Sequence, residues 1–212
     1  MSELSFVHRF EPGARSDGRP LLLLHGTGGD ENDLLPLGRM IAPGAPLLSP
    51  RGKVLEQGMP RFFRRLAEGV FDEQDVRARA HELADFVAAA RERYRLAAPL
   101  ALGYSNGANI AAAVMLLRPE ALAGGILLRA MPPLAAAEAN GGLAGVPVLI
   151  VSGARDPIAS PTHAARLKAM LERAGADVDH RILGGGHELS QADVGLARDW
   201  LQAQGVAQPA AS

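Results

Sequence analysis

A serine stands at the centre of Gly103-Tyr-Ser-Asn-Gly107, a pentapeptide of the form G-x-S-x-G. The apolar run 100–102 precedes it and the alanine- and leucine-rich stretch 108–117 follows it, which predicts a strand, a sharp turn and a helix. A serine hydroxyl at the apex of such a turn is presented as a nucleophile. Glycine is needed two residues either side of Ser105, because side chains there would collide as the strand and helix close on each other. The same pattern also fits an ordinary glycine-rich turn, so the assignment depends on partners elsewhere in the chain.

The first partner is a base, since an isolated serine hydroxyl is a poor nucleophile. Among the six histidines, His187 lies in a glycine-rich loop between the last predicted strand and the last predicted helix. That position allows its imidazole to reach over a neighbouring strand end. His25 comes before a glycine loop and is expected to be a structural or pocket-wall residue. The remaining histidines have positions typical of a surface or a sheet edge: His8, His81, His163 and His180.

The second partner is an acid that orients the base. Asp156 directly follows the predicted strand 147–151, and Pro157 stiffens the turn behind it. Asp177 and Asp179 are competitors, but they lie at the start or inside of a strand and therefore at the wrong end of the sheet. The predicted order is Ser105, Asp156, His187, which is one of several convergent triad arrangements.

Backbone N–H groups must then receive the negative charge that develops on the substrate oxygen. One candidate is the N–H of Asn106, which follows the serine at the beginning of a helix, where the helix dipole helps. The other is the N–H of Thr27, because Gly26, Gly28 and Gly29 let the backbone approach a ligand. A phosphate-binding turn is the alternative for this glycine loop, but the chain has neither G-x-x-x-x-G-K-[ST] nor a complete G-x-G-x-x-G there.

Strands and helices alternate along the chain, and most of the predicted strands are continuous apolar runs, although 177–183 alternates. This pattern predicts an α/β protein with a mostly parallel central sheet and helices on both faces. The chemistry-bearing loops then gather at the carboxyl ends of the strands. We expect Asn32 or Asp33 to cap the helix that follows the glycine loop, and Asp72 to open a long helix to about Tyr94. Residues 51–71 are the longest stretch without regular structure.

The composition excludes several classes of protein. With 212 residues and a formal net charge of -1, the chain suits one domain over 1–205 and lacks the basic excess of a nucleic-acid-binding protein. The tail 206–212 is expected to be frayed. The absence of cysteine excludes disulfides, a cysteine nucleophile and thiolate metal sites. No signal peptide and no membrane insertion are expected, so we predict a cytoplasmic protein, as a monomer or homodimer.

The order of these motifs resembles the α/β-hydrolase superfamily, and within it the phospholipase/carboxylesterase family of small serine esterases related to acyl-protein thioesterases. The likeness is greatest to the compact bacterial carboxylesterase branch and covers residues 19 to 203. It is carried by the four loop motifs H-G-T-G-G-D-E, G-Y-S-N-G-A-N, G-A-R-D-P and G-G-G-H-E. Shorter matches lie at Ser49-Pro-Arg-Gly52, Arg61-Phe-Phe-Arg-Arg65 and Leu128-Arg-Ala-Met131.

The resemblance implies a compact α/β-hydrolase fold without a separate cap domain. It also implies a triad of Ser105, His187 and Asp156, an oxyanion hole at Thr27 and Asn106, and neither a metal nor another cofactor. The expected activity is hydrolysis of small to medium carboxylic esters through an acyl-enzyme. Two alternatives stay open: a thioesterase or lysophospholipase with the same triad, and a non-catalytic binding protein on the hydrolase fold.

The small-molecule substrate is expected to contact the segment 51–65. Phe62 and Phe63 are predicted to form an apolar wall, and Arg51 and Arg64 to receive a carboxylate on the substrate, since a guanidinium matches that geometry. The alternative is solvated arginines above buried phenylalanines. Met131, just past a strand end, is predicted to line the acyl pocket or else to belong to the core.

Overall fold

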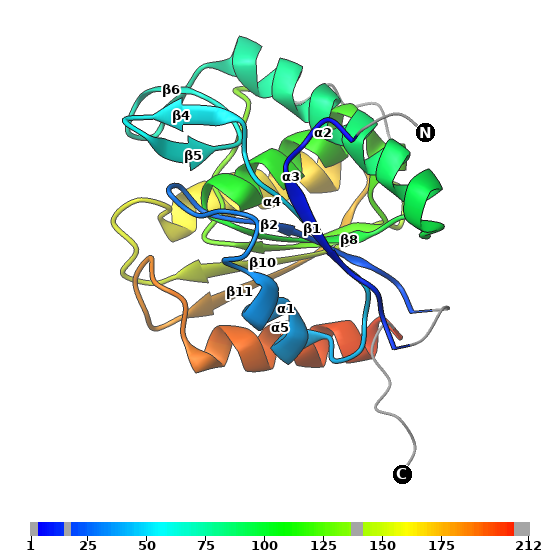
Figure 1. Ribbon diagram of the computed structural model, residues 1–212. Helices are drawn as coiled ribbons and strands as arrows, with labels where there is room; N and C mark the ends of the chain where they lie inside the picture. Colours follow the sequence, from blue (N-terminus) through cyan, green and yellow to red (C-terminus); the bar gives the residue numbers. More distant parts are fainter. Residues whose placement is uncertain (1–3, 15–17, 137–141, 206–212) are drawn as a thin grey trace.

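The centre of the molecule is a seven-stranded sheet in the order β1-β3-β2-β8-β9-β10-β11 (Figure 1). It belongs to a computed structural model that describes residues 4–14, 18–136 and 142–205; the segment 206–212, predicted to be frayed, lies outside these. β1 pairs antiparallel with β3, and the other five pairings are parallel. The strands of this sheet are β1 (His8–Glu11), β2 (Leu21–Leu24), β3 (Leu47–Pro50), β8 (Leu100–Tyr104), β9 (Gly124–Leu128), β10 (Pro147–Gly153) and β11 (Asp177–Leu183).

Helices cover both faces of the sheet (Figure 1). One face carries α2 (Glu73–Tyr94), α3 (Asn106–Leu117), the short 3₁₀ helix η1 (Pro119–Ala121) and α4 (Pro161–Arg173). The other carries α1 (Leu35–Ile41) and α5 (Gln191–Ala203), which pack side by side. The predicted α/β class is therefore confirmed.

The apolar sequence of the strands follows from this double cover. In β2, Leu22 and Leu24 belong to the core on the α2–α3–α4 side, whereas Leu21 and Leu23 belong to the core on the α1–α5 side. All four side chains are fully buried. Successive side chains of a strand point to opposite faces, so a strand covered on both faces needs an apolar residue at every position.

The segment 51–71 is more regular than predicted. It contains two small antiparallel hairpins, β4 (Val54–Glu56) with β5 (Met59–Arg61), and β6 (Arg65–Ala67) with β7 (Val70–Phe71). Gln57 and Gly58, both at positive φ, form the two-residue turn of the first hairpin, as the right-handed twist of paired strands favours. The strands are only two or three residues long and carry arginine and proline, which conceals the alternation by which strands are recognised.

The predicted N-cap residue is confirmed for α2 but not for α1. Asp72 caps α2 by accepting a hydrogen bond from the N–H of Asp75 (3.1 Å). α1 instead has Leu34 at its N-cap and no side-chain cap, so the prediction of an Asn32 or Asp33 cap is wrong. Proline in the first turn supplies a preset φ there. None of the helices in the described ranges has the length and apolar content needed to cross a bilayer.

Candidate active site

The turn that carries Ser105 joins β8 directly to α3. Ser105 is the N-cap of α3 and has φ 51° and ψ -113°, a conformation that side-chain-bearing residues seldom adopt. Its N–H donates to the carbonyl of Leu128 on the neighbouring strand (2.9 Å), which fixes the turn at the carboxyl edge of the sheet. The strained backbone lifts the hydroxyl above that edge, as the G-x-S-x-G pattern predicts.

The two glycines of the pattern are required by close packing. A β-carbon on Gly103 would lie 2.6 Å from the Cα of Ala108, at the start of α3. A β-carbon on Gly107 would lie 1.9 Å from the carbonyl oxygen of Leu24 on β2. The strand and helix can therefore close on each other only because both positions lack a side chain.

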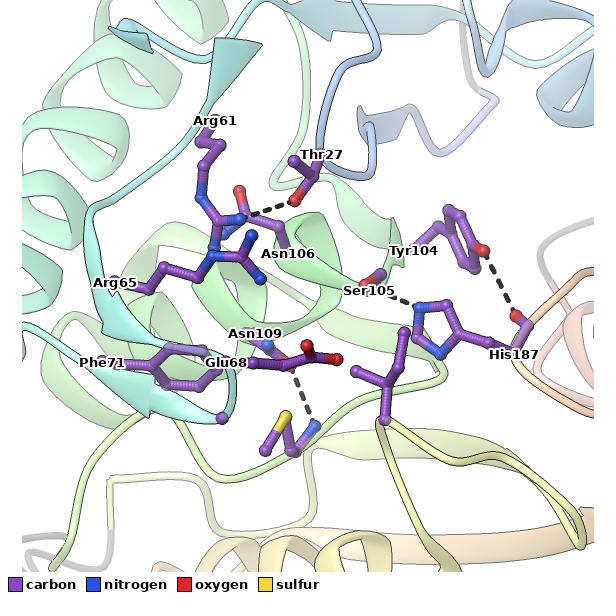
Figure 2. Close-up of a pocket in the computed structure, with 13 residues that line it drawn as sticks. Thr27, Arg61, Arg65, Glu68, Phe71, Tyr104, Ser105, Asn106, Asn109 and His187 are labelled. Carbon is purple, nitrogen blue, oxygen red and sulfur yellow. Dashed lines mark hydrogen bonds between the residues drawn. The ribbon is translucent and has the colours of Figure 1, made fainter. Parts of the chain in front are cut away.

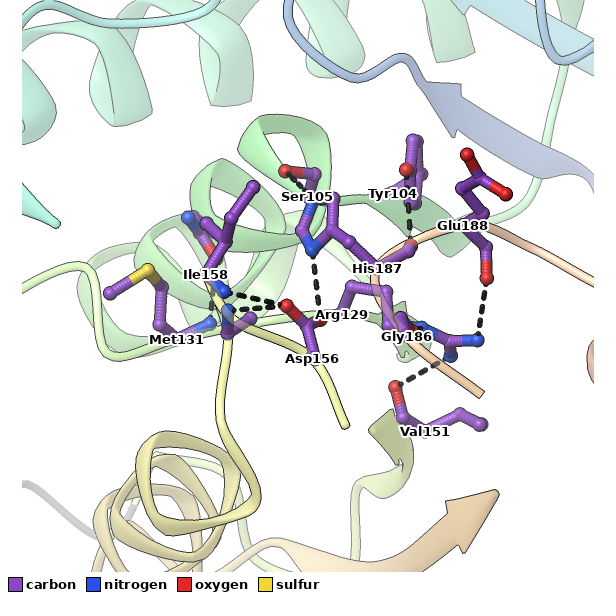
Figure 3. Close-up of polar contacts among 12 residues, drawn as sticks. Tyr104, Ser105, Arg129, Met131, Val151, Asp156, Ile158, Gly186, His187 and Glu188 are labelled. Carbon is purple, nitrogen blue, oxygen red and sulfur yellow. Dashed lines mark hydrogen bonds and ion pairs between the residues drawn. The ribbon is translucent and has the colours of Figure 1, made fainter. Parts of the chain in front are cut away.

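Ser105, His187 and Asp156 lie in one hydrogen-bonded chain, although they are far apart in sequence. His187 Nε2 lies 2.9 Å from Ser105 Oγ, and His187 Nδ1 lies 2.8 Å from Asp156 Oδ2 (Figure 3). The three loops follow β8, β10 and β11, whose carboxyl ends meet at one edge of the sheet. This arrangement can pass a proton from the serine hydroxyl to the imidazole while the carboxylate holds the ring.

Asp156 is built to stay ionised. Its other oxygen, Oδ1, accepts hydrogen bonds from the backbone N–H groups of Ile158 (2.8 Å) and Ala159 (2.9 Å). Burial raises the pKa of this carboxyl, but the two backbone hydrogen bonds and the His187 ring together outweigh burial, so the pKa lies below its usual value. Asp156 therefore presents a carboxylate to His187 at neutral pH.

Arg129, at the end of β9, holds the loop that carries His187. The sequence patterns did not identify Arg129 as part of the site. Its buried guanidinium donates to the carbonyls of Gly186 (2.8 Å) and Glu188 (3.0 Å), one on each side of the histidine (Figure 3). It also forms a bidentate ion pair with the buried Asp193 of α5 (2.7 and 3.0 Å). The one sequence signal was an arginine directly after the apolar strand 124–128.

Asp193 links this ion pair to the start of α5. Its Oδ2 also accepts hydrogen bonds from the N–H and the Oγ of Ser190 (both 2.8 Å). From the opposite side, the Tyr104 hydroxyl donates to the His187 carbonyl (3.2 Å; Figure 2). The backbone of the histidine loop is thus held by side chains from β8, from the end of β9 and from α5.

The backbone N–H groups of Thr27 and Asn106 have no hydrogen-bond acceptor within the described ranges of the chain. Asn106 is the first residue of α3, where an N–H has no partner inside the helix. Two groups from the segment 51–65 hold these residues in place. Arg61 Nη1 donates to Thr27 Oγ1 (2.9 Å), and the Phe62 N–H donates to Asn106 Oδ1 (2.8 Å).

His25 has a structural position, as expected. Its Nε2 accepts a hydrogen bond from the Gly52 N–H (2.9 Å), so Nδ1 must carry the proton that is donated to the Gly26 carbonyl (2.7 Å). Both bonds require a neutral ring. Burial lowers the pKa of His25, which favours the same neutral state.

A cavity of about 270 Å³ opens in front of Ser105 (Figure 2). Its polar wall is formed by Thr27, Arg61, Arg65, Glu68, Asn106 and Asn109. Tyr104, Ser105, His187, Gly69 and three apolar side chains, Phe71, Met131 and Ile158, complete the lining. The predicted position of Met131 in the pocket agrees with this lining.

The predicted positions of Arg51, Arg64, Phe62 and Phe63 do not agree with it. Arg51 pairs with Glu31 (2.5 Å), and Arg64 pairs with Asp72 (2.8 Å), both away from the cavity. Phe62 and Phe63 are buried in the core. Apolar burial is more favourable for the phenylalanines than a place on a polar wall, and each arginine has a carboxylate partner nearby.

The arginines of the cavity are instead Arg61 and Arg65, which the motif Arg61-Phe-Phe-Arg-Arg65 contained but did not distinguish. The sequence likewise contained no indication that Glu68, Phe71 and Ile158 line the cavity. The pairing of β4 with β5 and of β6 with β7 decides which side chains face Ser105, and that pairing carried no readable sequence signal.

The chain is similar to hydrolases of known sequence and structure. No protein-family model matches the chain. A Bacillus subtilis (strain 168) protein named "Putative hydrolase MhqD" is 46% identical over 195 residues, which are 91% of this chain and 96% of that protein. The crystal structure of a Bacillus cereus carboxylesterase is 43% identical, with 94% of both chains covered and a TM-score of 0.89. YahD, solved with malic acid, is 32% identical with a TM-score of 0.87, over 93% of this chain and 98% of YahD.

Proposed function

This chain belongs to the phospholipase/carboxylesterase family of α/β-hydrolases, and from that premise we propose that it is a serine esterase that cleaves small carboxylic esters. The observation that carries the proposal is the hydrogen-bonded chain from Ser105 Oγ through His187 to Asp156. The cavity in front of Ser105 supplies the space for a substrate. The carboxylesterase of Bacillus cereus, at 43% identity, supports the same reaction class.

Acylation begins when Ser105 Oγ attacks the ester carbonyl carbon. The hydroxyl proton passes to His187 Nε2, and the carbonyl oxygen takes up the negative charge of the tetrahedral intermediate. The N–H groups of Thr27 and Asn106 receive that oxyanion, and each such donor contributes about 3 kcal/mol to the stability of the transition state. Asp156 keeps the ring oriented and stabilises the imidazolium.

Collapse of the intermediate breaks the bond between the carbonyl carbon and the alcohol oxygen. His187 returns its proton to that oxygen, so the alcohol leaves neutral and the acyl group stays on Ser105. A water molecule then donates a proton to His187 while its oxygen attacks the acyl carbon. The second tetrahedral intermediate releases the carboxylic acid and restores the serine hydroxyl.

The size and lining of the cavity favour small acyl groups over long lipid chains. About 270 Å³ lined by two arginines, a glutamate and two asparagines suits a short, oxygen-bearing substrate. This argues against the lysophospholipase alternative. The malic acid in the YahD structure, a small hydroxy dicarboxylic acid, supports substrates of the same size class. A thioester would be attacked by the same groups. Turnover of the methyl ester, compared with turnover of the ethyl thioester of the same acyl group, ranks the esterase and thioesterase activities.

Ser105→Ala tests the proposal against a matched control. The chain contains a second serine–histidine contact, Ser152 Oγ to His180 Nε2 at 2.8 Å, which lies outside the cavity. We expect Ser105→Ala to abolish p-nitrophenyl acetate hydrolysis and labelling by a fluorophosphonate probe. Ser152→Ala is expected to retain both.

Two outcomes separate the rival functions. Retained turnover and labelling in Ser105→Ala would refute Ser105 as the nucleophile. Absence of turnover and labelling in the folded wild-type protein would instead favour a non-catalytic binding protein on the hydrolase fold. Circular dichroism of each variant establishes that loss of labelling is not loss of folding.

A further inference from the structure

The asparagines of the cavity have their carbonyl groups occupied. Asn109 Oδ1 accepts a hydrogen bond from the Met131 N–H (2.9 Å), and Asn106 Oδ1 accepts one from the Phe62 N–H (2.8 Å). These contacts fix the orientation of each amide, because a backbone N–H can only face an acceptor. The side-chain groups of Asn106 and Asn109 that these contacts do not use are the two Nδ2 amino groups, which are hydrogen-bond donors. Asn106 Nδ2 is buried and has no partner in the described part of the chain.

Arg65 adds a partly free guanidinium to the same wall. Its Nε and Nη2 contact Glu56 Oε1 (2.9 and 2.8 Å), which uses one edge of the fork. Nη1 has no acceptor among the residues that the structure describes. About a third of the Arg65 side chain is exposed, so this edge is open to a ligand. Figure 2 shows the Arg65 side chain extending from β6 toward the side of the cavity that holds Ser105.

Arg61 places a second positive charge behind this edge. Its side chain is only 4% exposed, and it contacts Glu56 (3.2 Å), the Phe63 carbonyl (3.2 Å) and Thr27 Oγ1. Glu56 is therefore shared between two guanidinium groups and balances the charge of only one of them. Because Arg61 is buried, water screens its charge less than it would at the surface.

One acidic side chain faces these donors. Glu68, in the β6–β7 turn, lines the cavity but forms no ion pair with Arg61 or Arg65 within the described ranges. Glu68 is exposed, so water weakens its field, whereas Arg61 acts from a buried position. The wall next to Ser105 is thus rich in donors, and its one carboxylate in the lining belongs to an exposed residue.

Given the esterase function proposed above, on which this step rests, we infer that Arg65, backed by Arg61 and Asn109, forms a carboxylate subsite. The substrates are esters that carry a carboxylate near the scissile bond. Bidentate recognition by a guanidinium provides both charge and directional hydrogen bonds, and Asn109 offers a further donor from α3. Phe71 and Ile158 supply apolar contact for the short carbon chain between the two groups.

The experiment compares matched charged and neutral esters. Monomethyl succinate against methyl pentanoate places the carboxylate on the acyl side, and acetoxyacetate against propyl acetate places it on the alcohol side. Turnover is followed as acid release in a pH-stat. We expect kcat/KM of the wild type to favour the charged ester by at least about tenfold in one of the two pairs, as a charge-assisted hydrogen bond gives.

Arg65→Met and Arg64→Met are the matched variants. They change adjacent arginines, of which only Arg65 lines the cavity, while Arg64 pairs with Asp72 on the surface. We expect Arg65→Met to lower the charged-to-neutral ratio of kcat/KM about tenfold, and Arg64→Met to leave it unchanged. Glu68→Gln is expected to raise the ratio, since it removes the opposing charge.

Binding of succinate, measured by titration calorimetry, tests the subsite without turnover. We expect Arg65→Met to weaken succinate binding about tenfold relative to both the wild type and Arg64→Met. Equal ratios in both ester pairs, or equal effects of Arg65→Met and Arg64→Met on the ratio and on binding, would overturn the subsite. Absence of all ester turnover together with Arg65-dependent succinate binding would refute the esterase and leave the subsite standing.

Discussion

Replacing Arg129 by methionine removes the guanidinium that holds the histidine loop, while keeping most of the apolar stem. Arg129 and Asp193 are both 1% exposed in their side chains, so the variant leaves an unpaired carboxylate in the interior. The carbonyls of Gly186 and Glu188 also lose their donor. The backbone strain is unchanged, because methionine has the same β-carbon as arginine at this positive φ (57°).

The structure supports a large effect on folding. Removing one partner of a buried ion pair costs about 3–5 kcal/mol, because the remaining charge stays desolvated. Single domains have free energies of unfolding of about 5–15 kcal/mol, so the folded state of the variant is expected to be only slightly more stable than the unfolded state. Catalysis should fall as well, since His187 lies between the two carbonyls that Arg129 holds. A displacement of about 1 Å in a catalytic group can lower the rate about a hundredfold.

Urea unfolding and p-nitrophenyl acetate hydrolysis measure the two effects separately. Arg118→Met is the control, because Arg118 forms surface ion pairs with Asp85 and Glu120, which contribute less than about 1 kcal/mol. The double variant Arg129→Met/Asp193→Asn removes the stranded charge and keeps an acceptor for the Ser190 N–H.

The double variant is expected to recover much of the lost stability without recovering kcat, because the loop carbonyls still lack their donor. Equal free energies of unfolding for Arg129→Met and Arg118→Met would refute the energetic part of this reasoning. Full recovery of kcat in the double variant would refute the positioning part.

Two further outcomes follow from packing and from proton linkage. Gly107→Ala is expected to prevent folding, since its β-carbon would lie 1.9 Å from the Leu24 carbonyl oxygen. The control is Gly184→Ala, because no described atom lies within 4 Å of a β-carbon at that position. Equal soluble yield and equal Tm of the two variants would contradict the packing argument. Burial holds the pKa of His25 below the usual histidine value of about 6.5, so near pH 6 the unfolded chain binds more protons than the fold. The stability that depends on neutral His25 is present above about pH 6.5 and decreases as the pH falls toward the lowered pKa. Urea unfolding of the wild type and of His25→Gln should therefore give a difference in the free energy of unfolding that becomes smaller on acidification. A difference that does not depend on pH would exclude this linkage.

Local patterns in the sequence were sufficient for the fold class and for the elbow around Ser105. The central strand β2 is apolar at every position because helices cover both faces of the sheet, and that pattern is visible without a structure. The glycines at 103 and 107 are demanded by one strand-to-helix turn, so their spacing is a local signal. Asp156 and His187 could be named as the partners of Ser105 because carboxyl ends of parallel strands meet at one edge.

The wall of the cavity was not predictable from the same information. Arg51, Arg61, Arg64 and Arg65 share one side-chain type within fifteen residues, and no periodicity distinguishes them. Arg64 and Arg65 are adjacent, yet one pairs with Asp72 and the other lines the cavity. Strand pairing over two- and three-residue strands decides this, and such pairing depends on tertiary contacts rather than on local propensity.

The sequence by itself indicated the α/β class, the elbow and the candidate order of Ser105, Asp156 and His187, because short runs of residues carry each of these signals. Only the tertiary structure decided how these residues are held and what they face. Arg129 meets Asp193 across 64 positions of the chain, and Arg61 meets Thr27 across 34. A buried charge is tolerated only where a partner satisfies it, and the partner is chosen by proximity in the folded protein, which the spacing of residues along the chain does not encode.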